Sequence, residues 1–96
     1  MIHCIMLGKY SSEGLKNVSK ERTARVIDAI KPNGSVNAIY GLLGEYDVAI
    51  IAQFKSLEDV IKTSITLNKV TGISFRTMPG VSVEECKQLV EACNSS

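Results

Sequence analysis

Four stretches of the chain are rich in apolar residues and are bounded by glycine, proline or polar residues, which is typical of β-strands. The four stretches are 2–10, 35–43, 46–54 and 72–78. In three other segments the apolar residues recur every three or four positions, as they do along one side of an amphipathic helix. These segments are 11–31, a segment that begins at Ser56 and a segment that begins at Ser82. The predicted order is therefore β-α-β-β-α-β followed by a final helix.

This order of elements matches the split βαβ unit of ferredoxin-like proteins. With right-handed connections it gives an α+β fold, in which a four-stranded antiparallel sheet carries two helices on one face. The length of 96 residues suits one domain with one core, and the sequence shows no repeat, linker or low-complexity segment. We therefore expect a single domain over residues 1–96, with the last helix added to the ferredoxin-like unit.

The predicted helices have recognisable starts and apolar stripes. Ser56 and Ser82 are each followed by an acidic residue three positions later, which is the capping box that begins many helices. The segment 11–31 is interpreted as a short turn over 12–17 and a longer helix that Ser19 caps, and Pro32 prevents its continuation. The predicted core stripes are Thr23, Val26, Ile27 and Ile30; Leu57, Val60, Ile61, Ser64 and Ile65; and Cys86, Leu89, Val90 and Cys93.

Gly44-Glu45 separates the second and third predicted strands. A two-residue loop that begins with glycine is typical of a type II′ turn, so we expect a tight hairpin at this point. The alternation in the second strand leaves open which set of residues faces the helices. The two sets are Asn37, Ile39, Gly41 and Leu43, and Val36, Ala38, Tyr40 and Leu42.

Composition argues against several classes of protein. The chain is 45% hydrophobic and 22% charged, as globular proteins are, and its net charge of +1 provides no field that would attract nucleic acid. No apolar run approaches the roughly 20 residues that cross a bilayer, and the N-terminus does not resemble a signal peptide. Cys4, Cys86 and Cys93 lack a CxxC spacing and are interpreted as reduced, buried apolar residues. We therefore expect a cytoplasmic protein without metal or cofactor, and without nucleic-acid or membrane partners.

The two faces of the predicted sheet differ in character. The helix-facing set contains Ile2, Cys4, Met6, Tyr46, Val48, Ile50, Ala52, Phe54, Ile73 and Phe75. The opposite face has an apolar centre of Ile5, Leu7, Ala49, Ile51 and Met78, with His3, Lys9, Asp47, Gln53, Ser74 and Arg76 around it. The free face of an antiparallel sheet is normally polar, and an exposed apolar patch usually marks a partner surface. We expect a second copy to cover this face, sheet against sheet, in a homodimer or a higher homo-oligomer.

The run Leu43-Gly44-Glu45-Tyr46-Asp47-Val48 resembles the hairpin for which the GYD domain family is named. The opening residues 6–17, Met-Leu-Gly-Lys-Tyr-Ser-Ser-Glu-Gly-Leu-Lys-Asn, are similar to the first strand and turn of that family. Glu45 stands where members often carry other residues, at a loop position that should face solvent. The resemblance implies a ferredoxin-like fold and a dimeric α+β barrel assembly, and it implies no particular reaction.

The polar residues around the apolar centre are candidates for binding a ligand. They are Lys9, Tyr10, Asp47, Arg76, His3 and Gln53. Lys9 and Arg76 fit a carboxylate or phosphate, unless an ion pair with Asp47 neutralises them. His3 is the only histidine of the chain, and it is either a general base or a plain surface residue.

Three functions fit these features. The first is a homo-oligomeric small-molecule-binding or regulatory domain, with a pocket for a small anionic or hydrophobic ligand. The second is a cofactor-free enzyme of the dimeric α+β barrel type, monooxygenase- or isomerase-like, in which Lys9, Asp47, Arg76 and His3 act on a small hydrophobic substrate. That interpretation depends on analogy between folds. The third is an assembly module without chemistry. We expect the first.

Overall fold

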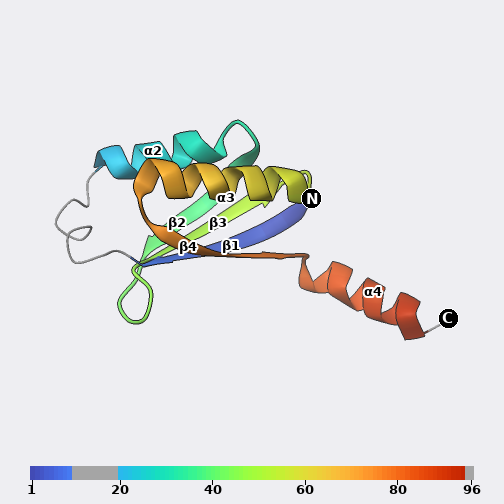
Figure 1. The fold of residues 1–96 in the computed structure, drawn as a ribbon. Helices are drawn as coiled ribbons and strands as arrows, with labels where there is room; N and C mark the ends of the chain where they lie inside the picture. Colours follow the sequence, from blue (N-terminus) through green and yellow to red (C-terminus); the bar gives the residue numbers. More distant parts are fainter. Residues whose placement is uncertain (10–19, 95–96) are drawn as a thin grey trace.

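The computed structural model describes residues 1–9 and 20–94. Its elements are β1 (Ile2–Lys9), α2 (Lys20–Ile30), β2 (Gly34–Gly41), β3 (Val48–Phe54), α3 (Leu57–Thr71), β4 (Ser74–Gly80) and α4 (Val83–Asn94) (Figure 1). The strands form one antiparallel sheet in the order β2-β3-β1-β4. The predicted ferredoxin-like fold with an additional C-terminal helix is therefore confirmed. The predicted turn over 12–17 and the cap at Ser19 lie outside the described residues, as does Tyr10.

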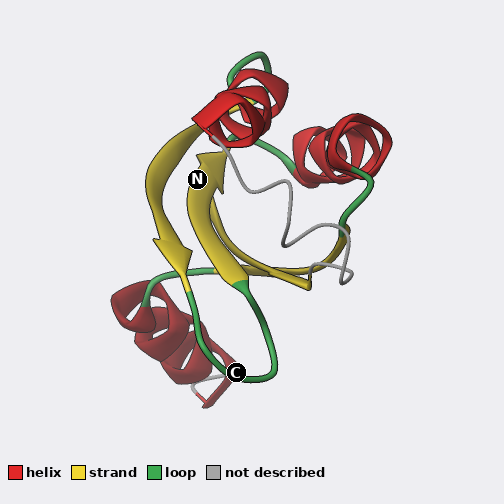
Figure 2. Cartoon of the chain, turned by 90° about the vertical axis from the view of Figure 1, so that its left-hand side faces the viewer, coloured by secondary structure: helices red, strands yellow, loops and turns green. Residues whose placement is uncertain are grey.

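Helices α2 and α3 lie side by side over one face of the sheet, and α4 lies on the other side, away from it (Figure 2). The core fills the space between the sheet and α2 and α3. It consists of Cys4, Met6, Val26, Ala29, Ile30, Val48, Ile50, Ala52, Phe54, Val60 and Leu67, with Ile2, Val36, Ile39 and Phe75 packed against it. The helix-facing positions predicted for β1, and for β3 from Val48 onward, are thus confirmed.

A serine side chain caps the start of α3 and another caps the start of α4, as the sequence predicts. The amide of Asp59 donates to Ser56 Oγ at 3.2 Å, and the amide of Glu85 donates to Ser82 Oγ at 3.2 Å. Gly72 ends α3 with φ of 68°, a left-handed conformation that glycine adopts without a steric penalty. Because Gly72 serves as this cap, β4 starts at Ser74, two residues later than predicted.

The predicted stripes of α2 and α3 are partly wrong. In α2 the buried residues are Val26, Ala29 and Ile30, while Ile27 is exposed. In α3 they are Val60, Thr63 and Leu67, while Leu57, Ile61 and Ile65 are about half exposed. Because α3 carries apolar residues on two sides, its periodicity identifies a helix without telling which side meets the sheet.

The hairpin between β2 and β3 exists, but its predicted two-residue turn is wrong. The strands stop at Gly41 and resume at Val48, so the loop 42–47 joins them. The amide of Leu42 donates to the carbonyl of Asp47 at 2.8 Å, and the amide of Asp47 donates to the carbonyl of Gly8 at 2.9 Å. Asp47 is thus bonded toward β1 as well as across the hairpin, and Tyr46 and Asp47 precede β3 instead of beginning it.

A β-bulge in β2 explains why its alternation left the two faces undecided. Val36 pairs with Ala52, and Ala38 pairs with Ile51. A step of two residues along β2 therefore corresponds to a step of one residue along β3. The extra residue reverses the alternation, as bulges do. Val36 and Ile39 therefore both face the helices, while Ala38 and Tyr40 share the opposite face.

Helix α4 extends beyond the end of the sheet (Figure 1). The radius of gyration is 15.1 Å, against about 13 Å for a compact chain of this length, and the longest extent is 53 Å. Helix α4 has no buried residue. The predicted burial of Cys86, Leu89, Val90 and Cys93 is therefore wrong within this chain, whereas that of Cys4 is confirmed.

Candidate functional site

The face of the sheet opposite α2 and α3, here called the open face, is defined by the strand register. Its middle contains two rows that each cross all four strands. One row is Ala38, Ile51, Ile5 and Met78, and the next is Tyr40, Ala49, Leu7 and Arg76. Seven of these eight side chains are wholly or largely apolar, so the apolar centre predicted from Ile5, Leu7, Ala49, Ile51 and Met78 lies on one contiguous surface.

Most of the apolar centre of the open face is accessible to solvent in the described part of the chain, although Ala49 is buried. Ile5 is 45% exposed, Met78 46% and Tyr40 57%, and these three residues lie on three different strands. Leu7 and Ile51 lie between them and are half-buried. A contiguous exposed apolar surface of this kind marks an interaction site in soluble proteins.

The candidate polar residues divide between the two ends of the open face. At one end Lys9 pairs with Ser74 and Leu7 pairs with Arg76, so the two cations are diagonal neighbours about 7 Å apart at Cβ. Asp47 lies at this end, because its amide bonds to Gly8. At the other end His3 pairs directly with Gln53. Six residues of strand, about 20 Å, separate His3 from Lys9, so one chain does not bring them into one site.

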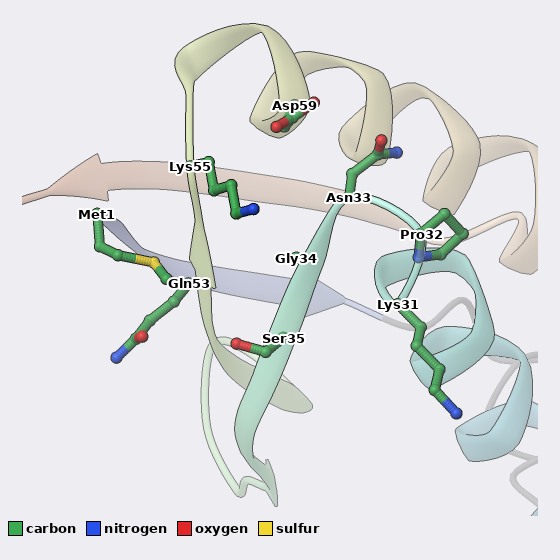
Figure 3. Close-up of a pocket in the computed structure, with 9 residues that line it drawn as sticks. All are labelled: Met1, Lys31, Pro32, Asn33, Gly34, Ser35, Gln53, Lys55 and Asp59. Atoms are coloured by element: carbon green, nitrogen blue, oxygen red, sulfur yellow. The ribbon is translucent and has the colours of Figure 1, made fainter.

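A cavity of about 510 Å³ opens at the His3 end of the sheet, where β2 begins and β3 ends. It is lined by Met1, Lys31, Pro32, Asn33, Gly34, Ser35, Gln53, Lys55 and Asp59 (Figure 3). Among the predicted ligand-binding residues that the structure describes, only Gln53 lines it. Gly34 is required in this wall, because a Cβ there would lie 2.5 Å from both the carbonyl oxygen of Gln53 and the ring of Phe54.

Lys55, Asn33 and Asp59 form the polar group of this cavity. Lys55 extends from the end of β3 toward Asn33 and Gly34, and Asp59 lies above them on the first turn of α3 (Figure 3). Lys31 lines the same cavity but points away from this group (Figure 3). An ammonium group and an amide in one cavity wall can hold a carboxylate or phosphate oxygen.

Charges elsewhere in the described residues contribute little to this site. Lys62 and Glu58 form a salt bridge of 3.2 Å on the exposed side of α3, and no salt bridge of Lys9, Arg76 or Lys55 is found in the described part of the chain. Burial raises the pKa of the Cys4 thiol, which lies in the core and away from every cavity wall described above.

Two further properties of residues 1–9 and 20–94 bear on function. None of the helices there combines the length and the apolar character that a membrane span requires. No group of three or more His, Cys, Asp and Glu side chains in this part of the chain is arranged to hold a metal ion.

Fold and surfaces together define a ferredoxin-like α+β domain with an apolar sheet face that no element of the described residues covers. The chain belongs to the GYD domain family, whose model matches residues 4–90. No curated protein is significantly similar to it in sequence.

Solved structures share the fold at low sequence identity. The leucine response regulatory protein LrpA of Mycobacterium tuberculosis aligns with a TM-score of 0.64 and 11% identity, over 84% of this chain and 51% of LrpA. The chain thus spans about half of the length of LrpA. Protein TTHA0845 from Thermus thermophilus aligns with a TM-score of 0.59 and 18% identity, over 85% of this chain and 95% of that protein. Hypothetical protein PHS023 from Pyrococcus horikoshii gives the same score and identity, over 85% and 92% of the two chains. Identities this low indicate a shared fold only.

Sequence reasoning missed most of the cavity. Lys31, Asn33 and Lys55 lie in connections between elements, and the sequence pattern does not tell which connections meet in space. One signal was available: Gly34 and Lys55 flank two strands that were expected to pair as a hairpin. The outer ends of such a hairpin must lie side by side, which brings 31–35 close to 53–55.

Proposed function

We propose that this chain is a small-molecule-binding domain that works as a homo-oligomer, in which the open faces of two copies pack together and each copy holds a small anion in the cavity of Figure 3. The observation that carries the proposal is the apolar surface on the open face, which no element of the described chain covers.

A second copy is the partner that suits this surface best. The two apolar rows lie across the middle of the sheet, at Ile5 and Leu7 of the central strand β1. A twofold axis near these residues brings apolar rows onto apolar rows, since a twofold interface uses the same patch on both subunits. Lys9 lies at one end of the face and Arg76 lies on the edge strand β4, so both can remain hydrated at the rim of the interface.

The cavity adjoins this interface. Gln53 and Ser35 line the cavity and belong to the end of the open face, where Ser35 pairs with Gln53 and Gln53 pairs with His3. A copy packed on the open face would therefore form part of the cavity wall on that side. Exclusion of water strengthens the attraction between the Lys55 ammonium and a bound anion, because charges interact more strongly in a medium of low dielectric constant.

A regulatory role has support from one structural neighbour. LrpA is named as a leucine response regulatory protein, and this fold accounts for about half of its chain. A small carboxylate is compatible with the lysine and amide groups of the cavity described here. We therefore favour a carboxylate-bearing metabolite as the ligand.

Thermal unfolding with defined anions tests the ligand part of the proposal. Citrate, phosphate and L-leucine are titrated at constant ionic strength, so that general screening stays fixed. An anion at ten times its dissociation constant stabilises the folded state by about 1.4 kcal/mol, which raises Tm by about 6 °C for a domain of this size. Lys55→Met should abolish this shift, and Lys87→Met on α4 should preserve it. A wild-type Tm that no carboxylate or phosphate raises in a saturable way would leave only assembly as the function.

A further inference from the structure

Helix α4 carries an apolar side that is exposed in the described part of the chain. At 100° per residue, Val83, Cys86, Leu89, Val90 and Cys93 fall within one third of the helix circumference. All five are exposed, and Val83 is 73% exposed. An isolated helix of twelve residues is marginal in water, and most helices in proteins are stabilised by packing of such an apolar side. Packing of this apolar side against another surface would therefore stabilise α4.

A second uncovered apolar surface lies between α3 and the edge strand β4. This groove has a volume of about 270 Å³. Its walls contain Leu57, Ile61 and Ile65 of α3 and Thr77 and Pro79 of β4, and Ser64 and Thr77 bond across it at 3.1 Å. Leu57, Ile61 and Ile65 are each about half exposed, at positions four residues apart that form one stripe along the helix.

We propose that α4 of one copy docks in the α3–β4 groove of a second copy, antiparallel to α3. The two surfaces agree in length. Helix α4 has 12 residues and is about 18 Å long. The groove extends from Leu57 to Asn68, about 17 Å along α3. Docking covers the apolar side of α4 and the apolar stripe of α3 together.

Two acidic residues in the first turn of α4, against the single Glu91 near its other end, favour an antiparallel direction of docking. The first turn of α4 contains Glu84 and Glu85, and the first turn of α3 contains Glu58 and Asp59. An antiparallel arrangement places Glu84 and Glu85 toward the C-terminal half of α3, which carries Lys69. It also sets the two helix dipoles in opposite directions, which is the favourable arrangement.

The same charges argue against α4 folding back into the groove of its own chain. Helix α4 begins just after β4, and Pro79 at the end of β4 lines the groove that starts at Leu57. A helix that turned back there would run parallel to α3, with Glu84 and Glu85 next to Glu58 and Asp59. Like charges in adjacent first turns repel each other, so the groove suits the helix of another copy.

Alkylation of Cys86 measures whether the apolar side of α4 is covered. Every protein used in this experiment carries Ile5→Lys, which removes the open-face contact. Any protection of Cys86 then comes from α4 docking, so the result does not depend on the proposed open-face dimer. Iodoacetamide labelling of Cys86 is followed by mass spectrometry. We expect the rate constant to fall tenfold or more as the protein concentration rises from micromolar to millimolar. Leu89→Glu should abolish this dependence, whereas Gln88→Glu on the polar side of α4 should keep it.

Complementation between two variants distinguishes a second copy from the same chain. Ile61→Glu damages the groove but leaves α4 intact, while Leu89→Glu damages α4 but leaves the groove intact. Both residues are exposed, so circular dichroism should show folded chains. Mixing should protect Cys86 of the Ile61→Glu chain at least tenfold, and the double variant Ile61→Glu/Leu89→Glu should give no protection as a partner. Two results would overturn the proposal. In the first, Cys86 reacts rapidly at every protein concentration. In the second, Cys86 is protected to the same extent at every concentration and in every mixture.

Discussion

Replacing Ile5 by lysine perturbs the centre of the open face without disturbing the core. Ile5 is 45% exposed in the single chain. Complete burial of an isoleucine side chain is worth roughly 1.5–3 kcal/mol, so covering the exposed part contributes about 1 kcal/mol per copy. Because a twofold interface contains Ile5 twice, the substitution removes about 2 kcal/mol from the dimer, a factor of about 30 in Kd. The cost of burying two lysine charges in the interface would raise Kd further.

Ile27→Lys is the matched control for this experiment. Ile27 lies on α2, on the helix side of the molecule, and is 38% exposed, so the chemical change and the starting exposure are similar. Sedimentation equilibrium should give a Kd at least 30-fold weaker for Ile5→Lys and an unchanged Kd for Ile27→Lys. The free energy of unfolding of either monomer should change by less than about 0.5 kcal/mol. Equal Kd values for the two variants would refute the assignment of the interface to the open face.

Three further predictions concern the fold. Gly34→Ala should lower the free energy of unfolding by about 1–3 kcal/mol, because the added Cβ would meet the backbone of Gln53. Gly41→Ala should leave this free energy unchanged, because no atom lies within 4 Å of its Cβ position. Urea unfolding of the two variants tests this difference. Thr63→Val should raise that free energy by about 1 kcal/mol, since Thr63 Oγ1 is buried without a hydrogen-bond partner in the described residues, and an unchanged or lower value in the same assay would count against this interpretation. Burial raises the pKa of the Cys4 thiol, so folding should lose stability as the pH rises above the ordinary thiol pKa, where the unfolded chain releases this proton first; Cys4→Ala should flatten that part of the pH profile.

Local sequence signals predicted the fold where one interaction decides the structure. The Ser56 and Ser82 caps form as expected, because each needs only a hydroxyl and an amide three residues away. The faces of β1 and β3 follow because successive side chains of a strand without a bulge point to opposite faces, so placing one residue places the others.

The prediction failed where tertiary packing chooses between two similar options. Helix α3 presents two apolar sides, and contact with the sheet selects Val60 and Leu67 over Ile61 and Ile65. The bulge between Val36 and Ala38 has no sequence signature that separates it from an ordinary strand.

The candidate site was only partly accessible from the sequence for a related reason. Alternation correctly placed the residues of the open face, because each position depends only on its own strand. The cavity depends instead on the meeting of the loop at Asn33 with the end of β3 at Lys55, a contact between segments about twenty residues apart. The sequence pattern also gave no reason to expect α4 outside the body of the protein, since its apolar side resembles that of a core helix.

Packing of a second copy on the open face is the central proposal, and the mass of the unmodified protein in solution tests the self-association that it requires. Sedimentation equilibrium from micromolar to millimolar concentration should give at least twice the chain mass of 10.4 kDa. A mass that stays at that of one chain up to millimolar concentration, with the apolar centre in contact with water, would contradict it.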